Sequence, residues 1–178
     1  YQVEKVLQMS LYDGGNIALK MLPLDANELI DSVVQTFNIK VVQNGGSIDT
    51  NLDAVDSMVK VDEMHFTNVI FNLMDNAVKY KRDDVSLQLK VSTRSDSDNL
   101  YIQIEDNGIG IQKDDLKRVF DKFYRVHTGN THNVKGFGLG LAYVHKMVKL
   151  HHGTIKATSE YGKGTRFMIT LPLCKEKE

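Results

Sequence analysis

Two stretches in which apolar and polar residues alternate constrain the fold more than any other feature of the sequence. Their apolar positions recur at every second residue, at Val85, Leu87, Leu89 and Val91 in the first stretch and at Leu100, Ile102 and Ile104 in the second. Because successive side chains of a β-strand point to opposite faces, both stretches predict strands with one buried face. The chain is therefore expected to form a sheet that is covered on one side.

Helical segments separate the predicted strands only in part. Asp25 and Glu28 have the spacing of a capping box and predict a helix that runs to about Val42. The other expected elements are helices over about 62–80 and 138–151, a helical segment over 111–120, and strands over about 17–22, 47–50, 57–61, 155–159 and 165–171. This order predicts an α+β fold, a two-layer sandwich with helices on one side of a mixed sheet.

Length and composition fit one globular domain with a hydrophobic core. The chain has 178 residues, of which 42% are hydrophobic and 25% are charged. Its formal net charge of −1 gives no basis for binding to nucleic acid or to an anionic membrane. Cys174 is the only cysteine, which excludes an internal disulfide and a multi-cysteine metal site. No apolar run approaches the roughly 20 residues that span a bilayer.

The first residues have the pattern of a short amphipathic helix. Apolar residues recur there at helical spacing, at Val3, Val6, Leu7 and Leu11. Gly14 and Gly15 end the pattern, and a helix this short is not stable by itself in water. The sequence also begins within the pattern and without Met. We therefore expect a fragment of a longer protein whose helix continues upstream.

The helix expected at 62–80 carries a stripe of amides. Asn68, Asn72 and Asn76 are spaced four residues apart, and Lys79 and Tyr80 extend the stripe. The opposite face is apolar, with Val69, Ile70, Leu73 and Ala77. For a helix taken alone, a solvated polar face is the simpler interpretation. However, Glu, Lys and Arg are better helix formers on a free surface, so a row of neutral amides also fits a cavity that binds a metal ion or a phosphate.

The segment EDNGIGI, residues 105–111, follows the second predicted strand. Asp106 continues the alternation of that strand, so its carboxylate is expected on the apolar side, where it needs hydrogen-bond donors. Asn-Gly is also a strong hairpin signal, but the next residues, IQKDDLKRVF, have a helical pattern instead of that of a strand. A flat ligand with an exocyclic amine, approached closely by the backbone at Gly108 and Gly110, explains the combination better.

The segment GFGLGL places Gly136, Gly138 and Gly140 at the start of a predicted helix. Free backbone N–H groups and the positive end of the helix dipole suit phosphates there, although a flexible hinge is an alternative. The dinucleotide-binding fingerprint does not fit because no strand precedes the glycines. Shortly before them, FDKFYRV places Arg125 at the edge of a polar segment, as expected for a phosphate contact, whereas its two aromatic residues three positions apart, taken by themselves, more simply fill the core.

Together, these segments resemble the boxes of the catalytic and ATP-binding domain of sensor histidine kinases. NLMDNAVKY is similar to the N box of that family, DNGIGI to its G1 box, FDKFYRV to its F box and GFGLGL to its G2 box. Residues 162–165 are similar to the last glycine motif. The resemblance covers about Leu24 to Leu173 and implies the Bergerat fold, a mixed five-stranded sheet backed by three helices. It also implies that residues 1–13 end the second helix of an upstream dimerisation and phosphoacceptor hairpin, and that 14–178 form the catalytic ATP-binding domain.

The resemblance implies ATP and Mg²⁺ as ligands and gives the matched residues roles. The implied ATP-binding residues are Asn72, Asn76, Lys79, Tyr80, Asp106, Gly108, Gly110, Gly136, Gly138, Leu139, Gly140 and Thr165. Asn76 is the implied ligand of Mg²⁺, and Lys79 reaches the phosphates. The resemblance further implies that Asp106 accepts a hydrogen bond from the adenine amine and that Tyr80 packs near the base. It implies that Arg125 stabilises charge on the transferring phosphoryl group, under a lid of roughly residues 112–137.

Asn72 indicates a kinase instead of a hydrolase. Gyrase-like and mismatch-repair ATPases carry at the corresponding position a glutamate that activates water. An amide cannot accept that proton, so transfer to another acceptor is favoured over hydrolysis. Asn72 is therefore an expected catalytic residue, together with Arg125.

The phosphoacceptor is expected upstream of Tyr1. Histidine kinases phosphorylate a histidine in a box of the form His-Glu/Asp-x-x-Arg/Lys, and none of the six histidines lies in such a box. Residues 151–154, His-His-Gly-Thr, also depart from the usual His-Gly-Gly of the family. Phosphoryl transfer to an upstream histidine is the implied function. An ATPase of the same fold and a nucleotide-binding regulatory module without catalysis are the alternatives.

The implied partners are the upstream hairpin and the receiver domain of a response regulator. We expect the fragment to be a monomer and its parent a homodimer. No binding to nucleic acid is expected. The resemblance implies a cytoplasmic domain and leaves open whether the parent is anchored in the bacterial inner membrane.

Overall fold

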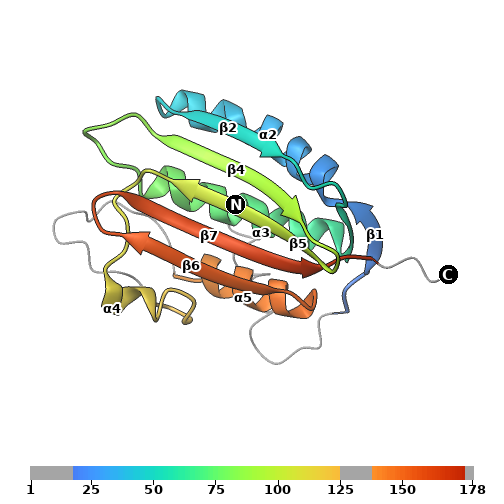
Figure 1. Cartoon of the computed structure of the whole chain (residues 1–178). Coiled ribbons are helices and arrows are strands. Elements are labelled where there is room, and N and C mark those ends of the chain that lie inside the picture. Colours follow the sequence, from blue (N-terminus) through green and yellow to red (C-terminus); the bar gives the residue numbers. More distant parts are fainter. Residues whose placement is uncertain (1–17, 125–137, 175–178) are drawn as a thin grey trace.

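The computed structural model describes residues 18–124 and 138–174 of the chain. A five-stranded sheet forms one layer, and helices cover one of its faces (Figure 1). The strands, in spatial order, are β2 (Ser47–Leu52), β4 (Gln88–Ser95), β5 (Asn99–Asp106), β7 (Gly164–Pro172) and β6 (Thr154–Glu160). The covering helices are α2 (Ala26–Gln43), α3 (Glu63–Lys79) and α5 (Gly140–Leu150). The expected α+β two-layer sandwich, the Bergerat fold, is confirmed.

The pairing of the strands makes the sheet mixed. Strands β2 and β4 run parallel, whereas the β4–β5, β5–β7 and β6–β7 pairs are antiparallel. A separate antiparallel pair joins β1 (Leu22–Asp25) to β3 (Met58–Val61). The short helix α4 (Lys113–Leu116) follows β5. The segment EDNGIGI, residues 105–111, therefore begins with the last two residues of β5 and continues beyond the end of the sheet toward α4.

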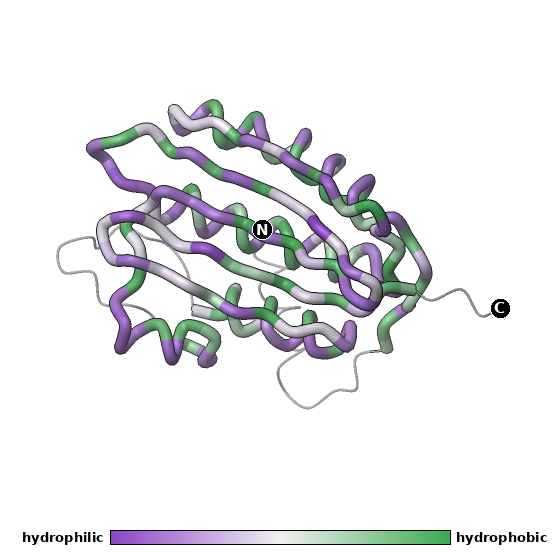
Figure 2. The backbone as a smooth tube through the Cα atoms, in the orientation of Figure 1, coloured by the Kyte–Doolittle hydropathy of each residue, from purple (hydrophilic) through white to green (hydrophobic). Residues whose placement is uncertain are grey.

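The core lies between the sheet and the three long helices. Hydrophobic and hydrophilic residues alternate along the strands, and the helices carry both kinds (Figure 2). The predicted apolar faces are buried, at Leu100, Ile102 and Ile104 of β5 and at Val69, Ile70, Leu73 and Ala77 of α3. Burial of these faces is the main force that holds the two layers together.

The boundaries of the elements agree with the sequence where local signals decide them. Asp25 caps α2 as expected, because its side chain accepts hydrogen bonds from the N–H groups of Asn27 and Glu28. Asp62 caps α3 in the same way. The helical segment expected over 111–120 is a helix only at α4.

Two strand boundaries differ from the sequence expectation. Residues 18–21 are not in a strand, since β1 begins at Leu22, where it pairs with Val61 of β3. Strand β4 begins at Gln88, which pairs with Ser47, the first residue of β2. Val85, which was expected in this strand, lies outside the sheet, and its exposed fraction is 40%. In both cases the partner strand sets the boundary, and a single-strand pattern does not contain this information.

His151 and His152 end α5 in different environments. His151 is buried, and its Nε2 accepts a hydrogen bond from the N–H of Asp62 at 2.9 Å while its Nδ1 lies 2.7 Å from the carbonyl oxygen of Met147. Burial lowers the pKa of His151, which favours the neutral ring that this arrangement needs. His152 is exposed and has a φ of 61°, in the left-handed region that favours glycine.

We expect His152→Gly to stabilise the fold by about 1 kcal/mol, since a residue with a Cβ in this region costs roughly that much. For a chain of this size the thermal midpoint would rise by about 2–4 °C. The matched control is Lys149→Gly, an exposed position inside α5 where glycine should lower the midpoint. Thermal unfolding followed by circular dichroism measures both variants. A lower midpoint for His152→Gly would show that the position tolerates histidine without strain.

The expected role of residues 1–13 in an upstream hairpin remains a prediction, because this segment lies outside the described residues. The same holds for the boundary at residue 14. In the part of the chain that the structure describes, no helix combines the length and apolarity needed to cross a membrane.

Candidate functional site

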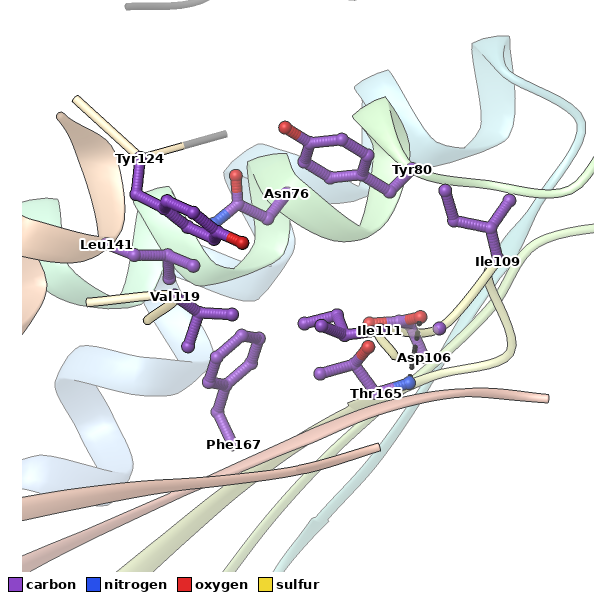
Figure 3. Close-up of a pocket in the computed structure, with 11 residues that line it drawn as sticks. Asn76, Tyr80, Asp106, Ile109, Ile111, Val119, Tyr124, Leu141, Thr165 and Phe167 are labelled. Atoms are coloured by element: carbon purple, nitrogen blue, oxygen red, sulfur yellow. Dashed lines mark hydrogen bonds between the residues drawn. The ribbon is translucent and has the colours of Figure 1, made fainter. Parts of the chain in front are cut away.

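A pocket opens between α3 and the end of the sheet formed by β5 and β7 (Figure 3). Its lining consists of Asn76, Tyr80, Asp106, Ile109, Gly110, Ile111, Val119, Tyr124, Leu141, Thr165 and Phe167. Apolar walls with a few polar groups among them are typical of a small-molecule site.

Asp106 is the last residue of β5 and continues the face that carries Ile102 and Ile104. Its Oδ1 accepts hydrogen bonds from the backbone N–H groups of Gly108 at 2.8 Å and Thr165 at 3.3 Å. Figure 3 shows the bond from Thr165 as a dashed line. Within the described residues, the protein donates no hydrogen bond to Oδ2. The predicted inward turn of Asp106 is thus confirmed, and its Oδ2 is available to a donor in the pocket.

Burial raises the pKa of Asp106 to about 6, and the nearby carboxylate of Glu105 adds to the rise. The backbone hydrogen bonds from Gly108 and Thr165 oppose this shift, because they favour the ionised form. The carboxyl group is therefore ionised at neutral pH and becomes protonated in mild acid. In its ionised form it accepts hydrogen bonds and donates none.

Gly108 and Gly110 make room for neighbouring backbone. A Cβ at Gly108 would lie 2.4 Å from the carbonyl oxygen of Tyr80, and one at Gly110 would lie 2.2 Å from that of Glu160. Gly110 also has a φ of 69°, which only glycine adopts readily. The N–H of Ile109 donates to the Tyr80 carbonyl at 2.9 Å. Gly108 therefore lets the segment lie against the end of α3, and Gly110 lets it lie against the end of β6. Their expected role toward a bound base remains a prediction.

The three amides on α3 lie in different environments. Asn76 lines the pocket, and within the described residues its Nδ2 is buried without a hydrogen-bond partner. Asn72 lies one turn earlier, and its Nδ2 donates to the carbonyl of Asn68 at 2.7 Å. A Cβ at Gly140 would lie 3.2 Å from the Oδ1 of Asn72, so this oxygen is next to the start of α5. Asn68 is exposed, as a solvated face would be.

Lys79 is not among the residues that line the pocket. Its Nζ lies 2.5 Å from Oδ2 of Asp75, four residues earlier on α3. Asp75 also accepts a hydrogen bond from Lys40 of α2. Burial alone would raise the pKa of Asp75, but the two lysines outweigh it and hold this pKa below its ordinary value. The expected contact of Lys79 with phosphates remains a prediction.

The start of α5 lies at the edge of the pocket, where Leu141 contributes to the lining. Gly138 has a φ of 69°, and Gly140 is the first helical residue. The first N–H groups of a helix have no carbonyl partner within the helix, and among the described residues no side chain caps α5. Such a helix start suits an anion. Leu139 is buried beside it.

Two predicted site residues, Arg125 and Gly136, lie outside the described residues, as does most of the expected lid over 112–137. Their roles remain predictions. At the described ends of this segment, the N–H of Phe123 donates to the carbonyl of Gly138 at 3.1 Å. Residues 123 and 138 are therefore held next to each other.

Most of the apolar walls were not predicted from the sequence. Phe167 lies on the same face of β7 as Thr165, so the alternation of this strand could have indicated it. Tyr124 belongs to the FDKFYRV segment, where aromatic residues were interpreted only as core. Its hydroxyl donates to Asp115, and the guanidinium of Arg118 lies 4.2 Å from the centre of its ring. These contacts fix Tyr124 at the wall of the pocket.

A divalent cation at this site would depend on oxygen atoms of amides and of the ligand. Among the described residues, no three histidine, cysteine, aspartate or glutamate side chains form a cluster that could hold a metal ion. The amide of Asn76 fits this requirement, because its Nδ2 is buried without a hydrogen-bond partner among the described residues and its oxygen can take the same position. The oxygen and nitrogen of an amide can exchange places by rotation, so either can face a ligand.

The geometry is that of a nucleotide site, with the acceptor Asp106 in an apolar pocket and the start of α5 at its edge. This defines the chain as a nucleotide-binding domain. Comparison with known proteins identifies its family. The chain belongs to the family of histidine kinase-, DNA gyrase B- and HSP90-like ATPases, whose family model matches residues 61–175.

Two relatives are named as a sensor protein and as a sensor histidine kinase. Sensor protein RprX of Bacteroides fragilis is 60% identical over 175 residues, which cover 98% of this chain and 34% of RprX. Sensor histidine kinase WalK of Bacillus subtilis is 34% identical over 176 residues, 99% of this chain and 29% of WalK. The chain thus spans about a third of the length of these relatives. The resemblance to the catalytic ATP-binding domain of histidine kinases is confirmed.

Solved structures share the fold. The histidine kinase ThkA, in a complex with the response regulator protein TrrA, superimposes with a TM-score of 0.77 at 21% sequence identity. The superposition covers 99% of this chain and 49% of ThkA. At this identity the likeness concerns the fold alone.

Proposed function

We propose that this domain transfers the γ-phosphoryl group of ATP to a histidine of its parent protein upstream of Tyr1. The observation that carries the proposal is the environment of Asn72. Its Nδ2 is bound to the Asn68 carbonyl, which leaves a neutral amide oxygen beside Gly140 at the start of α5. An amide oxygen at the phosphate end of the site cannot take a proton from water. Hydrolysis is therefore disfavoured, and transfer to a histidine is favoured.

The adenine base is proposed to bind at the Asp106 end of the pocket. The exocyclic amine donates to Oδ2 of Asp106, while Gly108 and Thr165 fix the other oxygen. Tyr80 packs near the base at the end of α3. The apolar walls exclude water, which strengthens the hydrogen bond between amine and carboxylate.

The phosphates are proposed to lie between α3 and the start of α5. The N–H groups that open α5, at Gly140 and after it, bind phosphate oxygens, and Gly138 and Leu139 shape the turn before them. Asn76 would hold Mg²⁺, which supplies positive charge that offsets the charge of the phosphates when bound. Lys79 is the further cation for the phosphates. Arg125 and Gly136 complete this set from the segment outside the described residues.

Two alternatives use the same pocket. The family includes ATPases, but an ATPase needs a base for water, and Asn72 cannot act as one. A regulatory module that binds nucleotide without catalysis does not need an intact phosphate-binding region between α3 and the start of α5. Among the described residues, Nδ2 of Asn76 has no hydrogen-bond partner and no side chain caps the start of α5, and both observations favour a working phosphate site over such a module.

The proposed partners follow from transfer to a histidine. The upstream hairpin would supply the acceptor, and the receiver domain of a response regulator would take the phosphoryl group from it. ThkA, a histidine kinase with this fold, has been solved in complex with a response regulator protein. We propose a cytoplasmic location for the domain, a monomeric state for the fragment and a homodimeric parent.

We expect the chain to bind ATP, to hydrolyse it very slowly and to form no stable phosphohistidine by itself, since none of its histidines lies in an acceptor box. When the parent's helical hairpin is added as a separate chain, its histidine should be phosphorylated only weakly. In the parent, the covalent link keeps the hairpin near the site at an effective concentration of roughly millimolar, and the separate chains lose this advantage. Incubation with γ-labelled ATP and Mg²⁺ measures both products, and the Asp106→Asn chain is the control. Rapid phosphate release would support an ATPase, and binding without transfer to the hairpin would support a regulatory module.

We expect the affinity for adenosine to fall as the pH is lowered through about 6, the pKa of Asp106. The amine binds the ionised carboxylate better than the protonated one, so affinity is full above this pKa. Below it, the affinity declines by up to about tenfold per pH unit. Adenosine is the suitable probe because the phosphates of ATP titrate in the same range. Calorimetric titration across this range provides the measurement, and a flat profile would exclude Asp106 as the acceptor.

A further inference from the structure

Lys79 has two neighbours on its own helix that compete for its ammonium group. Residues three and four positions apart lie on the same face of a helix. For Lys79 these neighbours are Asn76, which lines the pocket, and Asp75, which does not. The ammonium group lies on Asp75, 2.5 Å from its Oδ2. A lysine at this position can therefore serve either the carboxylate or a phosphate bound beside Asn76.

Asp75 has a second cation from another helix. Lys40 of α2 donates to Oδ1 of Asp75, the oxygen that Lys79 does not use. The side chain of Asp75 is 14% exposed, whereas those of Lys40 and Lys79 are 40% and 41% exposed. One largely buried carboxylate thus faces two ammonium groups. Since a single lysine neutralises it, the other is electrostatically in excess.

Lys40 is held more firmly than Lys79. Its Nζ lies 5.5 Å from the ring centre of Phe37 and 5.9 Å from that of Phe71. These two rings pack edge to face, with their centres 5.0 Å apart, so they form a rigid platform. An ammonium group is attracted to such ring faces. Among the described residues, Lys79 has no ionic or aromatic partner besides Asp75. Lys79 is therefore the cation that can leave.

We propose that Lys40 is a positioning residue that keeps Asp75 neutralised and thereby releases Lys79 to bind the phosphates. When Lys79 moves, Asp75 retains Lys40 and is not left as an unpaired, largely buried charge, which would be costly. Without Lys40, the same movement would strand Asp75, and Lys79 would stay on it. This inference rests on the proposed function, because it requires a polyphosphate in the pocket.

The test compares a non-hydrolysable ATP analogue with adenosine, by calorimetry on the 178-residue chain. Lys79→Met should weaken binding of the analogue by about tenfold or more, as expected for loss of one charged hydrogen bond. Lys40→Met should weaken it by a similar factor, although Lys40 lies outside the pocket. Asp75→Asn should strengthen it. Adenosine affinity should not change in any variant, because adenosine has no phosphate.

A second set of variants separates positioning from the general effect of charge. In the Lys79→Met background, Lys40→Met and Asp75→Asn should no longer change the affinity for the analogue. A long-range electrostatic effect would instead persist in that background. Lys40→Arg should restore the wild-type affinity. Lys81→Met removes a nearby lysine whose one hydrogen bond within residues 18–124 and 138–174 goes to the carbonyl of Asn44, so it is the matched control and should have little effect.

The outcomes distinguish this inference from the proposed function. Failure of the wild-type chain to bind the analogue would overturn both. Strong binding that Lys79→Met weakens and Lys40→Met leaves unchanged would overturn the inference alone. Effects of Lys40→Met that survive in the Lys79→Met background would also overturn it. Thermal unfolding of each variant shows that the fold is retained in the comparison.

Discussion

Asp106→Asn is expected to weaken ATP binding by about hundredfold while the fold stays intact. Because two backbone N–H groups fix Oδ1, the amide oxygen of the variant must take that position. The NH₂ group of the new side chain then occupies the place of Oδ2. A donor faces the adenine amine, which is also a donor, so the variant loses one hydrogen bond and gains a repulsive contact.

The fold of this variant should be at least as stable as that of the wild type. Burial raises the pKa of Asp106 to about 6. At neutral pH the carboxylate is ionised in both states, but its charge is less well solvated in the folded chain than in the unfolded chain and therefore lowers the stability of the fold. The amide removes this disadvantage and keeps both backbone hydrogen bonds. Glu105→Gln is the matched control, since Glu105 lies on the opposite face of β5 and bonds to Arg166. Calorimetric titration measures the ATP affinity of both variants. A near-native affinity of Asp106→Asn would contradict the assignment of the adenine base to Asp106.

Asn76→Ala is expected to abolish the Mg²⁺-dependent part of ATP binding and, with it, all phosphoryl transfer. The amide of Asn76 lies in the pocket with an unpartnered polar atom, and no acidic cluster among the described residues could replace it as a ligand. Titrations with ATP at increasing Mg²⁺ should show an affinity that no longer rises with the cation. The loss at saturating Mg²⁺ is expected to reach at least about tenfold.

The other amides of α3 provide the controls. Asn72→Ala should weaken binding less, because the Nδ2 of Asn72 already has a partner in the carbonyl of Asn68. Asn68→Ala changes an exposed residue of the same stripe and should leave binding unchanged. If ATP affinity still rises normally with Mg²⁺ in Asn76→Ala, Asn76 is not the ligand of the cation.

The parts of the fold that were predicted correctly depend on local physical signals. The burial of Ile102 and Ile104 follows from alternation in one strand, and the start of α2 follows from the cap at Asp25. The starts of β1 and β4 were not predicted, because pairing with β3 and β2 sets them. A pattern read along one segment does not contain the register of its partner.

The candidate site was likewise predictable where a local pattern decides the position of a residue, and not where a contact between distant elements decides it. The inward turn of Asp106 and the polar stripe with Asn76 could be read from single elements. The contact of Lys40 with Asp75 could not, because Lys40 reaches Asp75 from a helix 35 residues away in the sequence. The pair of Lys79 with Asp75 has the local spacing of four residues and was nevertheless not predicted. The wall formed by Tyr124 was missed for another reason, because the aromatic residues of FDKFYRV were interpreted as core although Asp115 and Arg118, which fix Tyr124, are near it in the sequence.

The most direct test of the account compares ATP with purine riboside triphosphate, which lacks only the exocyclic amine. The wild-type chain should bind ATP about tenfold to hundredfold more tightly, because the analogue leaves Oδ2 of Asp106 without a donor in an apolar pocket. Asp106→Asn should not prefer ATP. Calorimetric titration of both chains with both nucleotides gives the four affinities. Equal affinity of the wild-type chain for the two nucleotides would contradict the claim that Asp106 recognises adenine.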